Sequence, residues 1–438
     1  MAIVIRGGRV VDPSQGLDAV ADVLVADGRI AQVGDSFAVP NGAEVVDARG
    51  MIVTPGLIDV HAHLRDPGFS TKETLETGAR SAAQGGFTTV CCMPNTNPAL
   101  DTAERIAEIG ERARDLPVRV FPLGSITVGR ALEDVADLEA MARAGAVGFS
   151  DDGESTRNSQ AMRAALEWSA GSGLPIMVHC EDWSLINGGV MHEGAVSREL
   201  GLPGLAAAAE EIIINRDIEL SRITGGWLHV LHVSTARGRE LVRRAKLDGL
   251  NVTAEVMPHH LLLTDEWVAG RRRFVGSDQQ VDGPCPDPNA KVNPPLRTTA
   301  DAEALLAGLI DGTFDIIATD HAPHAKADKP IDLRRAASGM IGFEVALPLL
   351  LSLVRDGRLS MPLLVELLSV RPADRFHLSG GTLRPGSVAD LTIIDPDREW
   401  TVDESSIASR SKNTPLLGMT LRGRAHLTMV EGKIRYRA

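Results

Sequence analysis

The chain has little cysteine. Its 438 residues include four cysteines, none in a C-x-x-C pair: Cys91, Cys92, Cys180 and Cys285. So few thiols in a long chain exclude a disulfide-built scaffold and favour a reducing compartment such as the cytoplasm. Gly7-Gly8 interrupts the first apolar run, so the start does not resemble a signal peptide. No stretch reaches the roughly 18 apolar residues of a membrane span.

Positive charge is also scarce. Acidic residues outnumber Lys and Arg by 58 to 45, which gives a net charge of −13. Surfaces that bind nucleic acid or anionic membranes need clustered Lys and Arg, so the composition argues against both partners. An anionic substrate would need a local cation. With 44% apolar and 24% charged residues, the chain is an ordinary globular protein, long enough for a large barrel and a smaller companion.

The two ends of the chain share a pattern that the middle lacks. Residues 3–46 alternate short apolar stretches with Gly7-Gly8, Asp27-Gly28 and Asn41-Gly42, which predicts three hairpin turns. Beyond about residue 384 the same pattern returns, with a turn at Glu431-Gly432. We therefore expect residues 1–54 and 381–438 to form one small β-sandwich, with a separate domain over 55–380 inserted between them.

The middle of the chain alternates apolar runs with helical stretches. The helical stretches include 71–86, 134–145 and 234–249. The apolar runs are 57–63, 88–94, 118–124, 146–152, 175–180, 227–234, 251–258 and 315–323. This order predicts an α/β protein with a TIM-type (β/α)8 barrel. The longest irregular segment, 267–295, is either functional or a solvated insertion.

Histidine and aspartate fall where the predicted barrel strands end. They are His61, His63, Asp151, Asp152, His179, His232 and Asp320. Carboxyl ends of barrel strands converge on one mouth, so these side chains should face a common point. Residues i and i+2 of a strand share a face, so His61 and His63 can hold one cation. Nitrogen and oxygen ligands in this number suit Zn²⁺ or a similar ion, with enough for two metals.

Two metals need a bridging ligand. In many barrel hydrolases that ligand is a carbamylated lysine, but this chain has no lysine between Lys72 and Lys246. The bridge must then be Asp151 or Asp152, and the other should hydrogen-bond a loop. Because paired metals lower the pKa of bound water to about 7, the chemistry should be hydrolysis or its reverse. Asp320 is the candidate general base and acid.

His229 has strand parity opposite to His232. That parity predicts a structural residue that points toward the helix layer.

Several segments together resemble a known family. They are PGLIDVHAHLRDPG (55–68), MPNTNP (93–98), GFSDDG (148–153), VHCEDW (178–183), LHVS (231–234), PHHLLL (258–263), KVNPPLR (291–297), ATDHAPH (318–324) and ADLTIIDP (389–396). The set is similar to the cyclic-amide branch of the amidohydrolase superfamily and, within it, to bacterial dihydroorotases with an aspartate bridge. The resemblance runs along nearly the whole chain.

The resemblance implies a role for particular residues. His61, His63 and Asp320 would bind a first zinc, His179 and His232 a second, and Asp152 would bridge them. Asp320 would also carry the proton. Residues implied to contact substrate are His63, Arg65, Asn95, Asn293, His324, Ser338 and Gly339. Arg65 suits this role because a planar guanidinium is the natural clamp for a carboxylate.

The resemblance implies reversible conversion of N-carbamoyl-L-aspartate to L-dihydroorotate and water, with two Zn²⁺ per subunit, in pyrimidine synthesis. One alternative is another cyclic amidase, a hydantoinase or allantoinase, although those usually use the carbamylated lysine. A second is a silent scaffold relative, which should have lost ligands. The family also raises the expectation of a homo-oligomer and of association with aspartate transcarbamoylase.

Overall fold

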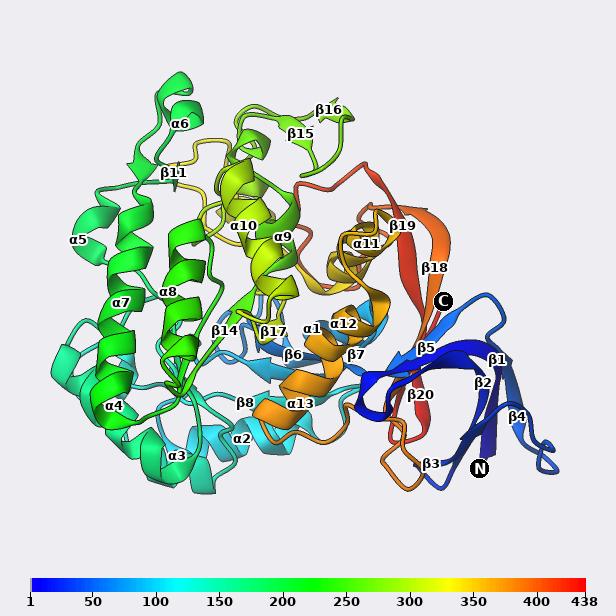
Figure 1. Cartoon of the computed structure of the whole chain (residues 1–438). Coiled ribbons are helices and arrows are strands. Elements are labelled where there is room, and N and C mark those ends of the chain that lie inside the picture. Colours follow the sequence, from blue (N-terminus) through cyan, green and yellow to red (C-terminus); the bar gives the residue numbers. More distant parts are fainter. Residues whose placement is uncertain (1) are drawn as a thin grey trace.

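The structure is a computed structural model that describes residues 2–438. It consists of a barrel of strands and helices and, beside it, a β domain that holds both β1 and β20 (Figure 1). No helix within residues 2–438 is long and apolar enough to cross a membrane.

The barrel strands are parallel and follow the chain order. They are β6 (Leu57–Ala62), β7 (Phe87–Cys92), β8 (Arg119–Pro122), β9 (Phe149–Ser150), β10 (Ile176–Val178), β13 (Leu228–Val230), β14 (Val252–Val256) and β17 (Ile316–Ile317). Two ladders, β6-β7-β8 and β9-β10-β13-β14-β17, are joined by parallel bridges between Gly124 and Phe149 and between Ala62 and His321. The bridges close the cylinder, so the predicted TIM-type barrel is confirmed.

Asp59 helps to close the barrel. Its buried carboxylate accepts hydrogen bonds from the backbone N–H of Thr319 at 3.1 Å and from the Thr319 hydroxyl at 2.5 Å. It also accepts from the N–H of His61 at 3.1 Å. The first and last barrel strands are thereby joined just below their functional ends.

The helices cover the outside of the barrel. The main ones are α1 (Leu75–Gly85), α2 (Ala103–Ala113), α3 (Leu138–Arg143), α4 (Ser159–Ser172), α7 (Ala207–Thr224), α8 (Ala236–Leu247), α10 (Thr299–Ile310), α11 (Phe343–Arg355), α12 (Met361–Val365) and α13 (Arg371–Arg375). Thr74, Thr235 and Thr298 cap their helices by accepting backbone N–H groups. Asp137 caps α3, so this helix begins four residues later than the predicted 134–145.

The β domain is one sheet in the order β20-β19-β18-β5-β1-β2-β3, with β4 also paired to β1. Its strands are β1 (Ala2–Asp12), β2 (Leu17–Ala26), β3 (Arg29–Gly34), β4 (Glu44–Asp47), β5 (Ile52–Pro55), β18 (Leu391–Thr401), β19 (Thr420–Val430) and β20 (Lys433–Arg437). Antiparallel pairing of β5 with β18 joins the two ends of the chain. Apolar side chains from both ends form one core, as the fold prediction required. We propose 1–54, 55–380 and 381–438 as the domain boundaries.

Two of the three N-terminal hairpin turns were predicted wrongly. The turn at Asp27-Gly28 joins β2 to β3. Gly7-Gly8, however, lies inside β1, where the register with β2 shifts, and forms a bulge. Asn41-Gly42 precedes β4, which pairs parallel to β1 rather than in a hairpin. Glycine supplies the same left-handed backbone to a bulge as to a turn, so the sequence pattern does not separate them.

Shorter elements surround the mouth of the barrel. They are α5 (Trp183–Ile186), β11 (Met191–His192), α6 (Ala195–Glu199), β12 (Gly204–Leu205), α9 (Pro258–Leu262), β15 (Arg271–Arg273) and β16 (Gln280–Asp282). The segment 267–295 is therefore less irregular than predicted, because β15 and β16 form an antiparallel hairpin within it. This hairpin stands above the barrel near α10 (Figure 1).

Candidate active site

The predicted metal ligands gather at one end of the barrel, each at or just after a strand. His61 is the second-last residue of β6 and His63 follows its end. Asp152 follows β9, His179 follows β10, His232 follows β13 and Asp320 follows β17. None of these residues is more than 6% exposed. Arg65, His232 and Asp320 have φ values of 59°, 32° and 46°, a left-handed backbone that is uncommon outside glycine and frequent at functional sites.

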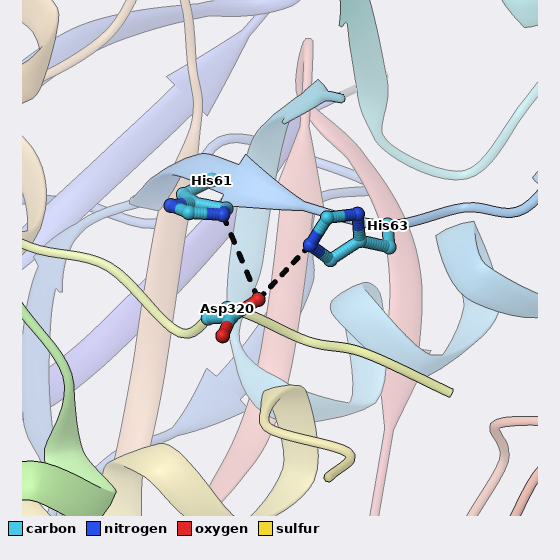
Figure 2. A group of neighbouring side chains, drawn as sticks. All are labelled: His61, His63 and Asp320. Carbon is cyan, nitrogen blue, oxygen red and sulfur yellow. Dashed lines mark hydrogen bonds and ion pairs between the residues drawn. The ribbon is translucent and has the colours of Figure 1, made fainter. Parts of the chain in front are cut away.

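Asp320 points between the two histidines of the H-x-H motif. Figure 2 shows its carboxylate facing both rings. Its Oδ1 lies 3.0 Å from His63 Nε2 and 3.6 Å from His61 Nε2. These three residues form one of the groups whose donor atoms lie close enough together to hold a metal ion.

Asp152 lies at the centre of the cluster. Its Oδ1 is 3.7 Å from His61 Nε2, 3.6 Å from His179 Nδ1 and 3.3 Å from His232 Nε2. Its Oδ2 is 3.3 Å from His63 Nε2. One carboxylate thus faces all four imidazoles, the placement that a bridge between two cations requires. His61, Asp152 and His232 form the second possible metal group; His179 is outside both groups, although its Nδ1 lies 2.9 Å from His232 Nε2.

Asp151 faces away from the histidines and binds neighbouring loops. Its carboxylate accepts hydrogen bonds from the Thr127 N–H at 3.2 Å, the Thr127 hydroxyl at 2.8 Å and the Thr156 hydroxyl at 2.9 Å. Arg130 holds the same turn by donating to the backbone oxygens of Asp151 and Asp152 at 2.9 and 2.6 Å. Asp151 therefore contacts neighbouring loops, whereas the adjacent Asp152 contacts the histidine cluster.

The histidines keep both central carboxylates ionised. Burial raises the pKa of Asp152, but His61, His179 and His232 outweigh burial and hold this pKa well below its ordinary range. Burial likewise opposes ionisation of Asp320, and its hydrogen bond with His63, with the nearby His61, lowers its pKa. Ionised carboxylates are the form that ligates metals and accepts protons.

The donor set fits a metal ion. His61 Nε2 is buried and has no hydrogen-bond partner among residues 2–438, although it lies against two carboxylates. A buried polar atom without a partner is costly unless something else satisfies it. The opposite nitrogen, Nδ1, contacts Glu255 at 2.6 Å, and His63 Nδ1 contacts Asn95 Oδ1 at 2.9 Å. Such contacts leave each Nε2 for a cation.

A cavity of about 280 Å³ opens onto the cluster. Its size suits a small polar ligand, since pockets for drug-sized molecules run from about 300 Å³ upward. Every residue predicted to contact substrate lines it: His63, Arg65, Asn95, Asn293, His324, Ser338 and Gly339. Burial lowers the pKa of Arg65 to about 10, so the guanidinium remains a cation at neutral pH.

Backbone groups of Ser338 and Gly339 form part of the cavity wall. The N–H of Gly339 donates to the Lys291 oxygen at 2.9 Å, and His324 Nε2 lies 2.8 Å from the Ser338 oxygen. Gly339 has a φ of 132°, and a Cβ there would lie 2.7 Å from the Cβ of Ala322. Only glycine fits this position without displacing the neighbouring segment at Ala322.

Sequence reasoning missed Asn413, from the segment between β18 and β19. Its Oδ1 accepts the N–H of His324 at 3.0 Å, and its Nδ2 donates to the oxygens of Ala322 and Gly339 at 3.1 Å each. This buried amide joins two walls of the cavity. Asn413 lies 89 residues beyond His324, outside the predicted barrel, so no strand-end pattern points to it.

Sequence reasoning also missed Glu255 and predicted the direction of His229 wrongly. The His229 ring packs edge-on against Phe376 at 5.5 Å, within the apolar cluster inside the barrel, and its Nε2 lies 3.2 Å from Glu255. Val230 belongs to the cluster that faces the helices. The alternation failed because the left-handed backbone at His232 ends the regular strand.

Known proteins resemble the chain in sequence and in structure. A family model described as dihydro-orotase-like matches residues 50–238. A dihydroorotase of Geobacter sp. (strain M21) is 48% identical over 439 residues, and one of Geobacter metallireducens is 46% identical over 438, with both chains fully covered in each case. Among solved structures, an L-hydantoinase (dihydropyrimidinase) from Arthrobacter aurescens has a TM-score of 0.84 at 30% identity, over 99% of this chain and 95% of its own.

Proposed function

The chain belongs to the dihydroorotase family and is a hydrolase of cyclic amides, and from that premise we propose how its site works. The reaction is the reversible closure of N-carbamoyl-L-aspartate to L-dihydroorotate and water, in pyrimidine synthesis. The observation that carries the proposal is Asp152, whose carboxylate faces four imidazoles beside a cavity lined by Arg65.

We assign two Zn²⁺ ions to the cluster, in keeping with its nitrogen and oxygen donors. His61, His63 and Asp320 would hold one ion, His179 and His232 the other, and Asp152 both. When bound, such a pair lowers the pKa of water to about 7 and polarises the ring carbonyl.

Asp320 carries the proton. In the hydrolytic direction the bond between the ring carbonyl carbon and the amide nitrogen breaks, and water supplies the new carboxylate oxygen. The ionised Asp320 accepts the proton that the attacking water gives up and donates it to the departing nitrogen. Closure of the ring follows the same path backward.

Arg65 binds the carboxylate that the substrate keeps throughout the reaction. Its Nη2 lies 3.3 Å from His324 Nε2, and its Nε donates to the Pro323 oxygen at 3.2 Å, which orient the guanidinium at the cavity wall. In a chain of net charge −13, a half-buried cation at this point gives an acidic substrate a specific position. Asn95 would help Arg65 to hold this carboxylate, with His324 nearby. Asn293 and the Ser338-Gly339 segment would touch the pyrimidine ring.

The decisive experiment measures bound zinc in the purified chain and follows ring closure of carbamoyl aspartate, with hydantoin and allantoin as competing substrates. We expect zinc at about two ions per chain and turnover of carbamoyl aspartate. Turnover of hydantoin or allantoin without carbamoyl aspartate would show that the substrate assignment is wrong. A chain that binds no zinc and turns over none of the three would instead support the silent scaffold.

Replacing Asn413 by Ala should weaken substrate binding more than it slows the chemistry. Loss of the amide releases the His324 and Gly339 backbones, so KM should rise about tenfold, equivalent to about 1.4 kcal/mol, while kcat changes less. Steady-state kinetics of ring closure measure both constants. Ser411→Ala is the control, since its hydroxyl binds the Lys72 oxygen at 2.6 Å and does not touch the cavity wall. A tenfold fall in kcat with an unchanged KM would contradict this role.

The location and partners of the chain remain predictions. The described cysteines are free and three are buried, which supports a cytoplasmic location. Light scattering of the pure chain, with and without aspartate transcarbamoylase, tests the expected homo-oligomer and the expected association.

A further inference from the structure

Glu255 is a buried acid that lies beneath the metal cluster without reaching its centre. It is on β14, it has no exposed surface, and its neighbours are histidines rather than lysine or arginine. Its Oε1 lies 2.6 Å from His61 Nδ1 and accepts the backbone N–H of His232 at 3.3 Å. One carboxylate oxygen therefore contacts a predicted ligand of each metal.

The second oxygen of Glu255 is held from the opposite side. His229 Nε2 lies 3.2 Å from Oε2, and His229 Nδ1 lies 2.8 Å from the Thr253 hydroxyl. That hydroxyl accepts from the indole N–H of Trp227 at 2.7 Å. An ionised carboxylate can only accept, so His229 Nε2–H donates to Glu255. In the neutral ring Nδ1 then accepts the Thr253 hydroxyl proton. This chain orients the carboxylate toward the cluster.

We propose that Glu255 is a positioning residue that orients both halves of the metal centre. By accepting the Nδ1 proton of His61, it fixes the tautomer that leaves Nε2 toward Asp152 and Asp320. By accepting the His232 N–H, it holds the left-handed turn that aims that ring at Asp152. The inference rests on the proposed metal centre and adds a residue from β14, the one barrel strand between β10 and β17 to which no ligand was assigned.

A carboxylate is chemically suited to this position. Removing an ionised group from water is costly unless it is fully hydrogen-bonded, and contacts from three different residues offset that cost for Glu255. Carboxylates that accept from a ligating imidazole also raise its basicity and hold its ring, and their removal weakens metal binding by about 10- to 100-fold. Glutamine keeps the shape but loses the charge and offers a donor where His229 already donates.

The test measures zinc affinity of the full-length protein by competition with a chromophoric chelator, together with the visible spectrum of the Co²⁺-loaded form. We expect Glu255→Gln to bind zinc about 10- to 100-fold more weakly than the parent and to alter the Co²⁺ absorption bands. Excess zinc should restore part of the lost turnover. Circular dichroism and thermal melts of the metal-free proteins show whether the variant is folded.

Glu344→Gln is the matched control, because Glu344 is also buried and accepts the N–H groups of Ala408 and Ser409 at 2.9 and 3.0 Å. We expect it to lose stability without losing zinc affinity. If Glu255→Gln is unfolded, Glu255→Asp, which keeps the charge on a shorter stem, takes the same measurements and should also bind zinc at least about tenfold more weakly.

Zinc affinity within threefold of the parent in a folded Glu255 variant would overturn the inference and leave the metal centre standing. Failure of both variants to fold would also overturn it, because Glu255 would then serve the fold alone. Absence of zinc from the parent itself is a separate outcome, and it would overturn the proposed metal centre first.

Discussion

Replacing Asp320 by Asn should lower kcat for ring closure by about 10³-fold, equivalent to about 4 kcal/mol of transition-state stabilisation. Asparagine has nearly the same shape and tolerates the left-handed backbone at this position, where φ is 46°. It has no carboxylate to take up the proton from water or to return it to nitrogen. Stopped-assay or spectrophotometric kinetics in both directions measure the loss, which should be the same in each.

The metal content of the Asp320→Asn variant separates proton transfer from ligation. Asp152 and the four imidazoles are untouched by the change, so most of the zinc should remain while turnover is lost. Asp315→Asn is the matched control at the opposite end of the same strand, where the carboxylate accepts the Ala254 N–H at 2.9 Å and binds Lys246 at 2.6 Å. That variant should be less stable and keep its kcat. A kcat for Asp320→Asn within tenfold of the parent would refute the assigned proton carrier.

The barrel could be predicted because its strands are buried on both faces. Runs such as 175–180 and 227–234 are almost continuously apolar, and each contains a barrel strand, β10 or β13. The rule that barrel strands converge at their carboxyl ends then brought His61, His179 and Asp320 to one place from 260 positions of sequence. The same rule says nothing about which face a residue takes once the strand ends.

Residues that act through other residues could not be predicted in this way. Glu255 lies inside a strand and Asn413 lies in a connection of the β domain, so neither ends a barrel strand. Their importance comes from hydrogen bonds to His61 and to the Gly339 backbone, across separations of 194 and 74 residues. Contacts over such distances depend on the finished fold. The direction of His229 was predicted wrongly for a different reason. The prediction compared its strand position with that of His232, which lies beyond the end of β13, where the in-and-out alternation of side chains no longer holds.

Asp151 and Asp152 are adjacent and chemically identical, and their substitutions should nevertheless have different effects. Asp152→Ala should remove the carboxylate that faces all four imidazoles, so zinc content should fall and kcat should drop by about 10³-fold or more. Asp151→Ala should instead lose three hydrogen bonds to Thr127 and Thr156. At roughly 1.5 kcal/mol or more for each bond to a charged group, it should be several kcal/mol less stable.

Zinc analysis, thermal unfolding and ring-closure kinetics on the two variants, prepared side by side, distinguish the two roles. We expect Asp152→Ala to lose zinc and turnover. We expect Asp151→Ala to lose thermal stability and to keep its zinc below its melting temperature. The reverse pattern would move the bridge to Asp151. A loss of zinc in both variants would mean that the loop held by Asp151 is itself required to present Asp152, and that the two carboxylates work as one unit through the backbone that Arg130 holds.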